Sequence, residues 1–581
     1  MHVVFSCALI SRSLKKAVLI AGIAMAASGL SAQTIISPGL QIGSANTAVA
    51  DPTVPRPATT PCTVQLFKDV KFADFSSKFF TFTPPASCPG PWAKVVLEAD
   101  FSIEAGRQFD RTANIWIGGT NIYFGTTAEP SRNVARSWHI ERDLTDYSAL
   151  FTTSQNGRVD LGNLVNSTFT SSLFGNADLA FYPLGNDDDG DSVDRRAPVA
   201  ADVVLPLSGS DTGGTVFLSS TASALARTFT LPRNVERAFL DVIAQSQAAD
   251  EFWYSCVPDD VAAELQDCGS TGFRETEVTI DGQPAGVAPV YPWVYTGGID
   301  PLLWRPIPGV QTLNFVPYRV DVTPFAGVLS DGQPHQLSVN VFNAARGFST
   351  TATLLLFLDH GSDQVTGAVT KNTIGAGPAP NIVEDLQNTN GNITGSVTVT
   401  STRNFVLEGF VRTSHGKVFT TVHQNIDFSN RQDFNVTNTV FGQKIAQNTT
   451  ITSITETRNQ DQTRTALQKF EWPFTLDFNF VVNPDGTGSQ ATSIQQSFNR
   501  SELVREHGDT VFFSTLSNSV APTDTLLFDS SFNITGGVNQ TNIQKYFSTD
   551  STGACFSRTI AADGGVLTSI TDGVGCNGED H

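Results

Sequence analysis

Carboxylates, arginines and aromatic residues stand close together at five places between residues 108 and 306. The places are Gln108 to Arg111, Thr127 to Pro130, Asp250 to Tyr254, Phe273 to Glu275 and Leu303 to Pro306. A carboxylate works as a general acid or base, and an aromatic ring covers the apolar face of a sugar ring. The clusters therefore indicate sugar chemistry. Ion pairs and core residues of an ordinary β protein give the same local pattern, and that alternative stays open at this point.

Motifs for several other chemistries are absent from the sequence. It has no G-x-S-x-G, no H-E-x-x-H and no P-loop, and its eight histidines are scattered. The run Asn186 to Asp191 is an acidic loop of a kind that can bind calcium. Its spacing does not fit an EF-hand and no Glu closes it, so we expect a solvated loop there. We predict no metal and no cofactor.

The elements that must position these residues are strands. Polar and apolar residues alternate in short runs such as Lys94 to Phe101, Glu275 to Asp281 and Gln336 to Phe342. The pairs Asp281-Gly282 and Asp331-Gly332 are typical of tight turns. The chain has 47 glycines and 41 phenylalanines, and only 16% of its residues are charged. This composition fits short strands joined by turns, so we predict an all-β protein.

The chain begins with a segment that is typical of a secretory signal. Arg12, Lys15 and Lys16 precede the apolar run Ala17 to Ala27, and Leu30 to Ala32 is a plausible cleavage site. An uncleaved membrane anchor is the alternative, although the run is short for one. We expect a secreted or periplasmic protein.

Shifts in composition divide the rest of the chain. Residues 33–60 and 363–395 are rich in Pro, Thr, Gly or Asn and lack a periodic apolar pattern, which is typical of linkers. The predicted organisation is a signal peptide over 1–32, a linker over 33–60, a first β domain over 61–208, a second over 209–362, a linker over 363–395 and a C-terminal β-rich domain over 396–581.

The charge of the chain limits its partners. Lys and Arg number 36 and Asp and Glu 56, a formal charge of −20. The signal holds three basic residues and no acidic one, so the mature chain has 33 against 56, or −23. Such a balance argues against nucleic acid as a partner. No later segment approaches the ~18 apolar residues of a membrane span. We expect no membrane partner after signal cleavage, and a monomer.

The cysteines predict disulfides. Cleavage of the signal removes Cys7 and leaves an even number, which in an exported chain favours disulfide bonding. Zinc is the alternative, but no C-x-x-C or flanking His pair supports it. The six residues fall into three local pairs, Cys62–Cys88, Cys256–Cys268 and Cys555–Cys576.

The same clusters resemble the peptide-N-glycosidase A family, the peptide-N4-(N-acetyl-β-glucosaminyl)asparagine amidases, over residues 60–580. The matching stretches include Gly106 to Arg111, Ile115 to Gly119, Thr127 to Pro130, Asp250 to Tyr254, Gly272 to Glu275 and Tyr295 to Pro306. The resemblance implies two tandem eight-stranded antiparallel jelly rolls, here followed by a C-terminal β-rich domain. It implies hydrolysis of the amide between Asn and the first N-acetylglucosamine of N-glycosylated peptides and glycoproteins, at acidic pH and with tolerance of core fucose.

A more distant similarity to peptide-N-glycosidase F implies roles for particular residues. The main catalytic Asp of that enzyme matches Asp110, which would be the base on water, held by Arg111 or Arg274. Its second carboxylate precedes a Phe-Arg pair, where this chain has Gly269 to Gly272. We therefore expect Glu275, Glu251 or Asp250 to supply that group. The predicted substrate-binding residues are Arg111, Glu129, Asp250, Trp253, Arg274, Tyr295, Trp304 and Arg305, with Trp253, Tyr295 and Trp304 as sugar-stacking rings.

Two other classes of function stay open. A glycosidase with two carboxylates would cut a C–O bond and leave N-acetylglucosamine on the Asn. A non-catalytic glycan-binding protein would use the aromatic residues without needing Asp110. Amide hydrolysis differs from both because it converts the Asn to Asp.

Overall fold

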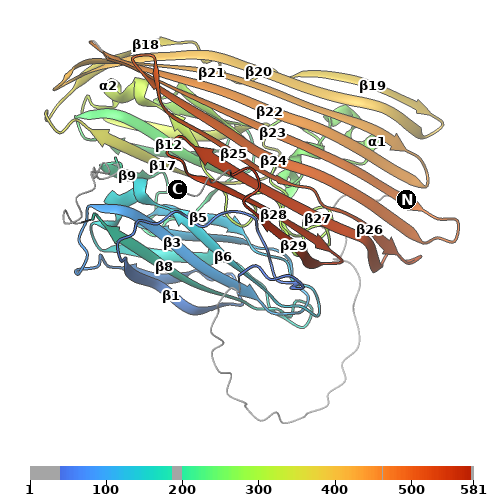
Figure 1. The fold of residues 1–581 in the computed structure, drawn as a ribbon. Helices are drawn as coiled ribbons and strands as arrows, with labels where there is room; N and C mark the ends of the chain where they lie inside the picture. Colours follow the sequence, from blue (N-terminus) through green and yellow to red (C-terminus); the bar gives the residue numbers. More distant parts are fainter. Residues whose placement is uncertain (1–38, 186–198, 461, 577–581) are drawn as a thin grey trace.

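The computed structural model describes residues 39–185, 199–460 and 462–576, and strands dominate it (Figure 1). The predicted signal peptide and the acidic loop Asn186 to Asp191 lie outside these residues. No helix in the described part of the chain is both long and apolar enough to cross a membrane.

The first domain is a sandwich of two four-stranded antiparallel sheets. One sheet has the order β1-β8-β3-β6 and the other β2-β7-β4-β5, which is the arrangement of an eight-stranded jelly roll. Alternation along strands such as β8 turns Leu173, Ala177 and Leu179 into the core between the sheets. The elements are β1 (Cys62–Phe72), β2 (Lys78–Phe82), β3 (Trp92–Ile103), β4 (Thr112–Ile117), β5 (Thr120–Thr126), β6 (Arg136–Asp143), η1 (Thr145–Phe151), β7 (Gln155–Leu161) and β8 (Leu173–Pro183).

The second domain repeats this order. Its sheets are β10-β17-β12-β15 and β11-β16-β13-β14, and β9 adds a fifth strand beside β17. The elements are β9 (Val203–Pro206), β10 (Val216–Leu218), β11 (Ala224–Thr230), β12 (Val235–Ser246), η2 (Ala248–Asp250), η3 (Trp253–Ser255), α1 (Asp259–Leu265), β13 (Glu275–Ile280), β14 (Gln283–Pro289), β15 (Tyr318–Asp321), η4 (Thr323–Phe325), α2 (Ala326–Leu329), β16 (Pro334–Phe342) and β17 (Phe348–Leu358). The tandem jelly rolls are thus confirmed. The predicted boundary between the two domains, after residue 208, is too late in the chain, because β9 already pairs with β17 of the second domain.

The C-terminal region is one 12-stranded antiparallel sheet, which in Figure 1 extends over the second domain with the first domain below. Its strands are β18 (Thr366–Asn372), β19 (Asn381–Thr389), β20 (Asn392–Thr413), β21 (Gly416–Val436), β22 (Val440–Asn459), β23 (Gln462–Val482), β24 (Gly488–Glu506), β25 (Asp509–Val520), β26 (Thr523–Phe528), β27 (Ile534–Asp550), β28 (Cys555–Asp563) and β29 (Val566–Asp572).

The predicted linker over 363–395 is wrong. It contains β18 and β19, and both pair with β20. β19 is almost wholly exposed, so it needs no apolar face, and its polar sequence concealed a strand.

The C-terminal sheet shares a hydrophobic core with the second domain. Tyr254 packs against Phe474, with ring centroids 4.6 Å apart, and Phe273 against Phe428 at 4.9 Å. Polar side chains join the same interface, since Asn430 Nδ2 donates to the Tyr254 carbonyl at 2.8 Å. The two regions therefore pack as a unit.

The described part of the predicted linker over 33–60 is also packed. Ala48 and Ala50 are buried in the core beneath the C-terminal sheet. The Ala48 N–H donates to the Pro306 carbonyl at 3.0 Å, and the Ala50 N–H donates to Gln544 Oε1 at 2.8 Å. These backbone bonds to distant elements replace strand pairing, which is why the segment has no periodic pattern.

Two of the three predicted disulfides are present, Cys256–Cys268 and Cys555–Cys576. Cys62 and Cys88 are free thiols, so the structure does not contain the third bond. Cys62 is in register with Phe181 of β8, and the Cys88 thiol donates to the Phe181 carbonyl at 3.6 Å. Burial beside Cys62 raises the pKa of the Cys88 thiol to about 11.

Candidate active site

A tight hairpin brings Asp110 and Glu129 together. β4 and β5 pair from Thr112 opposite Thr126, so the residues just before β4 lie beside those just after β5. The turn between the strands consists of Gly118 and Gly119, with φ of 55° and 80°, a conformation that glycine adopts without strain.

The second domain closes the site through Gly297. Its N–H donates to Asp110 Oδ2 at 3.1 Å, and Thr296 Oγ1 donates to the Thr127 carbonyl at 2.7 Å. A Cβ at position 297 would lie 2.9 Å from Asp110 Oδ1 and closer still to Glu129 Oε2. Both carboxylates therefore face this glycine, and the site lies at the junction of the two jelly rolls.

Glu251 is the third carboxylate of the site. It follows β12 and η2, and Tyr295 anchors this segment because its hydroxyl donates to the Ser246 carbonyl at 2.6 Å. Burial raises the pKa of Glu251 to about 8, and the negative charge of Asp110 adds to the rise. We call Asp110, Glu129 and Glu251 the carboxylate cluster.

Burial and mutual repulsion govern the protonation of the cluster. The pKa of Glu129 is raised to about 8 by burial and then by Asp110, with Arg305 opposing the rise. Burial also raises the pKa of Asp110, but the Gly297 N–H and the positive charge of Arg111 oppose that rise. The pKa values of Glu129 and Glu251 are thus both raised to about 8, and at Glu251 no cation among the described residues opposes the rise.

Arg111 and Arg305 border the cluster. Arg111 Nη2 donates to Gln108 Oε1 at 2.7 Å, and Arg305 Nη2 donates to the Pro130 carbonyl at 2.6 Å and lies 3.5 Å from Glu129 Oε1. The Nε atoms of both arginines are buried and have no hydrogen-bond partner in the described part of the chain. Both guanidinium groups thus place positive charge beside the cluster.

Asp250 and Arg274, predicted to bind substrate or to assist catalysis, have a structural role. Arg274 Nε donates to Asp250 Oδ1 at 2.8 Å, and both side chains are fully buried. Backbone N–H groups of residues 345–347 also donate to Asp250 at 2.7–3.1 Å. Arg274 Nη1 donates to three carbonyls, of Ser270, Thr271 and Phe273. These bonds occupy both Asp250 oxygens and the Nε and Nη1 atoms of Arg274.

Glu275 lies in a different environment from the cluster. It is buried on β13, and Arg403 Nε of β20 lies 3.5 Å from its Oε1. Burial raises the pKa of Glu275 to about 7, and the charge of Arg403 opposes the rise. The groups that perturb its pKa are Arg403 and Glu277, not Asp110. Glu275 therefore lies apart from the carboxylate cluster, and of the predicted catalytic residues only Asp110 and Glu251 belong to it.

The three predicted sugar-stacking rings are in the core. Trp253 is fully buried against Tyr254 and Phe428. Tyr295 is 5% exposed and Trp304 3%, and Trp304 Nε1 donates to the Gly298 carbonyl at 3.0 Å. The prediction of stacking is therefore wrong, since these faces are covered by protein. The sequence gives no sign that Gly297 belongs to the site, because sequence alone does not show which groups approach a glycine.

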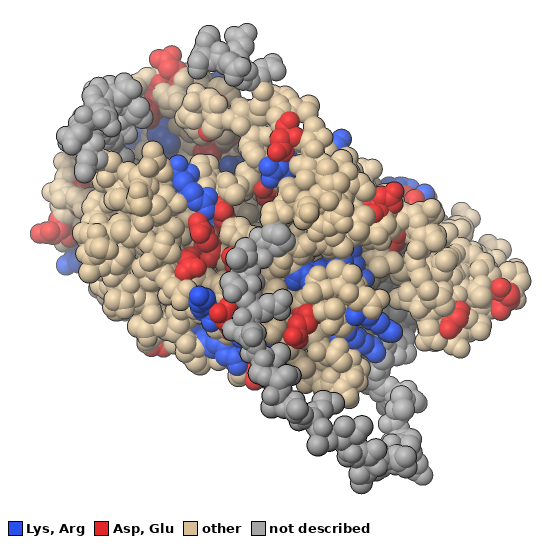
Figure 2. Space-filling view, turned by 60° about the horizontal axis from the view of Figure 1, so that its bottom comes forward, with Lys and Arg blue, Asp and Glu red and all other residues tan. Residues whose placement is uncertain are grey.

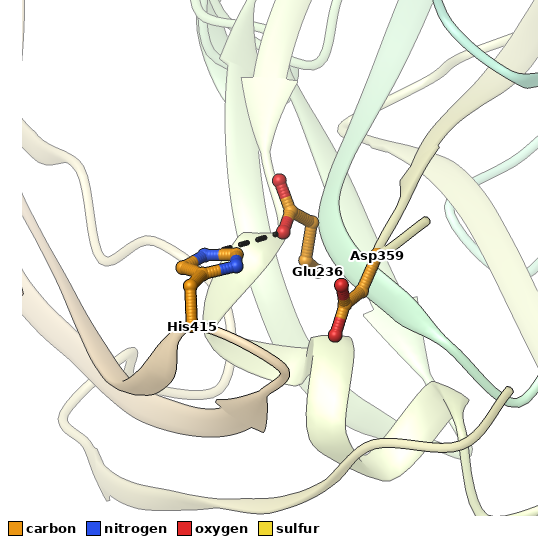
Figure 3. A group of neighbouring side chains, drawn as sticks. All are labelled: Glu236, Asp359 and His415. Carbon is orange, nitrogen blue, oxygen red and sulfur yellow. Dashed lines mark ion pairs between the residues drawn. The ribbon is translucent and has the colours of Figure 1, made fainter. Parts of the chain in front are cut away.

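Figure 3 shows a separate group of possible metal ligands, Glu236, Asp359 and His415. Their ligand atoms lie within 4.8 Å of one another, and no other such group of three occurs among the described side chains. The Asp359 carboxylate already accepts hydrogen bonds from the Ser414 backbone and hydroxyl and from the Gly361 N–H. The group therefore joins the second domain to the β20–β21 turn, and we do not assign it a metal.

The molecular surface carries mixed charge. On the face in Figure 2, acidic and basic side chains stand in small groups separated by uncharged surface. The carboxylate cluster, in contrast, gathers three acidic groups in a partly buried position between two domains. Together, the tandem jelly rolls and this cluster define an all-β protein with a site suited to acid–base hydrolysis.

The chain belongs to the family of the Peptide N-acetyl-beta-D-glucosaminyl asparaginase amidase A, which it matches over residues 51–373. That range contains both jelly rolls and the whole cluster. A relative from Prunus dulcis, the Peptide-N4-(N-acetyl-beta-glucosaminyl)asparagine amidase A, is 32% identical over 389 residues, covering 64% of this chain and 67% of the relative.

Solved structures with some similarity also come from proteins of related name. PNGase F, a glycosylasparaginase from Flavobacterium meningosepticum, aligns over 52% of this chain and 96% of its own, with 14% identity and a TM-score of 0.32. PNGF-II aligns over 52% of this chain and 66% of its own, with 12% identity and a TM-score of 0.33.

Proposed function

We propose that this enzyme hydrolyses the amide between an Asn side chain and the first N-acetylglucosamine of N-glycopeptides and glycoproteins. The whole glycan leaves as a glycosylamine, and the Asn becomes Asp. The observation that carries the proposal is the carboxylate cluster, which lies inside the region that defines the family. The family supplies the substrate class, and the cluster supplies the acid and the base.

In the proposed mechanism Asp110 is the base and Glu251 the acid. Asp110 takes a proton from water as the water oxygen attacks the amide carbon. Glu251 gives its proton to the amide nitrogen as the C–N bond breaks. The guanidinium groups of Arg111 and Arg305, which lie beside the cluster, orient the amide or the sugar. Each proton transfer of this kind typically contributes about 10²–10⁴-fold to the rate.

The alternative of a glycosidase predicts a different product. It would leave N-acetylglucosamine on an intact Asn, whereas amide hydrolysis leaves a peptide about 1 Da heavier than the unmodified Asn peptide, because NH₂ is replaced by OH. A glycan-binding protein without activity would release nothing. Mass spectrometry of one defined glycopeptide after incubation therefore separates the three functions.

Asp110→Asn tests the catalytic assignment. The variant keeps the size of the side chain and removes the base, so we expect at least a 10³-fold loss of glycan release with an unchanged melting temperature. Asp211→Asn is the matched control, because Asp211 is an exposed residue outside the cluster. Near-normal release by Asp110→Asn would remove Asp110 from the mechanism.

We also propose that the enzyme works at acidic pH. Glu251, with a pKa of about 8, holds its proton below that pH and loses it above, so kcat/KM falls on the alkaline side. Glu251→Gln should lower kcat about 10²–10⁴-fold and flatten this alkaline limb, as a pH series would measure. If the Glu251→Gln variant keeps weak activity and its kcat/KM still falls at alkaline pH as in the wild type, another group causes the fall. Glu129, whose pKa is also raised to about 8, would be the first candidate.

The remaining details of the proposal come from the family and the sequence. We propose that the mature protein is a secreted or periplasmic monomer and that it accepts core-fucosylated glycans. A pair of glycopeptides that differ only in core α1,3-fucose should give kcat/KM values within about tenfold of each other. Light scattering on the purified protein measures its oligomeric state.

A further inference from the structure

Three loops of the first domain lie at the end of the sheet β2-β7-β4-β5 where Asp110 stands. They are residues 73–77 before β2, 162–172 after β7 and 104–111 before β4. Lys78 of β2 is opposite Val159, and β7 ends two residues later. Ala113 of β4 is opposite Leu161. Since neighbouring strands lie about 4.8 Å apart, the loop before β2 is about 10 Å from the loop that carries Asp110.

Hydrogen bonds join the three loops into one surface. The Asn163 N–H donates to the Asp74 carbonyl at 2.9 Å, which ties the middle loop to the loop before β2. On its other side, Gln108 Nε2 donates to the Leu164 carbonyl at 3.0 Å and to the Ser171 carbonyl at 3.2 Å. The surface of the three loops therefore extends from the loop before β2 to Asp110.

Apolar side chains cover this surface. Phe75 is 69% exposed and Leu164 39%. Phe109 and Phe169 are half-buried and pack against each other, with ring centroids 5.2 Å apart, and the Arg107 guanidinium lies 5.5 Å from the Phe169 ring centroid. We call Phe75, Leu164, Phe109 and Phe169 the apolar patch. Exposed apolar residues that gather in one place mark a binding surface, whereas single ones do not.

The polar side chains of these loops are used within the loops. Gln108 Nε2 and Asn163 Nδ2 each donate to two backbone carbonyls, and Asn166 Oδ1 accepts from two backbone N–H groups. The patch therefore suits apolar side chains better than sugar hydroxyls. Glu129 follows β5, on the other side of β4, and Arg305 lies beside it. The polar flank of the site is thus opposite the patch.

We propose that the apolar patch binds the peptide part of the substrate, an extended chain with apolar side chains beside the glycosylated Asn. The sugar then lies toward Glu129 and Arg305. An extended chain rises about 3.3 Å per residue, so the distance of about 10 Å from the Asp110 loop to the Phe75 loop corresponds to about three residues. The inference rests on the proposed function, because it places the two halves of that substrate on opposite sides of Asp110.

Two synthetic glycopeptides test the proposal. Both carry N,N′-diacetylchitobiose on one Asn and have the same charged ends, and the three residues on either side of that Asn are Leu in one peptide and Gly in the other. We expect the wild type to release the glycan from the Leu peptide with a kcat/KM at least about tenfold higher, through a lower KM, because burial of the Leu side chains strengthens binding.

A double variant with Phe75→Ser and Leu164→Ser removes the exposed part of the patch. Both positions are on the surface, so the protein should still fold, and melting temperatures check this. We expect the preference for the Leu peptide to fall to less than about twofold. Phe513→Ser is the matched control, because Phe513 is 45% exposed on β25 of the C-terminal sheet, and it should keep the whole preference.

A fluorescently labelled Leu peptide without a glycan gives a readout that does not depend on turnover. Fluorescence polarisation measures its binding to the wild type, to the double variant and to Phe513→Ser. We expect the double variant to bind it at least about tenfold more weakly than the other two proteins.

Three results would overturn the proposal. The wild type releases the glycan from both peptides with equal kcat/KM, the folded double variant keeps the preference, or it loses release from both peptides to the same extent, which would show that the patch contacts the glycan. Failure of the amidase proposal would instead show as absence of release from either peptide. The labelled peptide would then still decide whether the patch binds a peptide.

Discussion

At the scale of single residues, Gly297 decides the geometry of the site. Its N–H binds Asp110, and its missing side chain leaves the space that Asp110 and Glu129 occupy. Its importance does not come from φ, since Gly297 is not among the residues with positive φ. Burial, and then the negative charge of Asp110 across this glycine, raises the pKa of Glu129 to about 8.

Gly297→Ala therefore tests the cluster without changing a charge. The new Cβ would displace both carboxylates, and a shift of about 1 Å in a catalytic group typically costs about 10²-fold. We expect kcat/KM to fall about 100-fold while the free energy of unfolding changes little. Gly375→Ala is the control, because its Cβ would have no heavy atom within 4 Å. Equal activity of the two variants would contradict the role of Gly297.

At the scale of elements, the C-terminal sheet holds the loop that completes the site. Gln540 Nε2 of β27 donates to the Arg305 carbonyl at 2.9 Å, and Asn542 Nδ2 donates to the Leu303 and Ile307 carbonyls at 3.0 and 2.9 Å. Asp524 of β26 meets Asp300 of the same loop, and both side chains are buried. Burial and the charge of Asp300 raise the pKa of Asp524, so the contact between the loop and the sheet favours a protonated carboxyl group there.

This carboxyl pair predicts how stability depends on pH. Burial and then the charge of Asp300 raise the pKa of Asp524 to about 8. An acid whose pKa is higher when folded binds its proton more tightly in the folded state, so its stabilising effect is complete below the unfolded pKa and is lost as pH rises to about 8. Asp524→Asn cannot ionise, so its free energy of unfolding should fall less between pH 5 and pH 8.

The size of that difference should be on the order of 4 kcal/mol, since stability changes by about 1.4 kcal/mol per pH unit over the roughly three units between pH 5 and pH 8. Urea unfolding of the wild type and Asp524→Asn at a series of pH values measures it. Asp509→Asn, at an exposed position, controls for the change in net charge. Identical slopes for the wild type and Asp524→Asn would show that the pair is not protonated in the folded protein.

At the scale of the whole molecule, the sequence predicted the fold class. Alternating runs indicated strands, and the resemblance gave the tandem jelly rolls, which the strand orders confirm. The segments over 33–60 and 363–395 were mistaken for linkers, because Ala48 and β19 are placed by tertiary contacts that leave no periodic pattern.

The site was predictable only in part. The sequence proposed Asp110 and Glu251 as catalytic carboxylates, and the structure brings these two together. It also proposed Glu275, which follows the Phe-Arg pair in sequence but lies beside Arg403 in the structure. Trp253, Tyr295 and Trp304 are core residues, and a sequence does not show which side of an aromatic ring the protein covers.

The measurement that tests the central claim most directly is the mass of a defined N-glycopeptide and its products after incubation with the wild type and with Asp110→Asn. The account predicts that the wild type yields intact free glycan and a peptide with Asp in place of Asn. It predicts that folded Asp110→Asn leaves the glycopeptide unchanged. A peptide that retains N-acetylglucosamine, or normal release by Asp110→Asn, would contradict it.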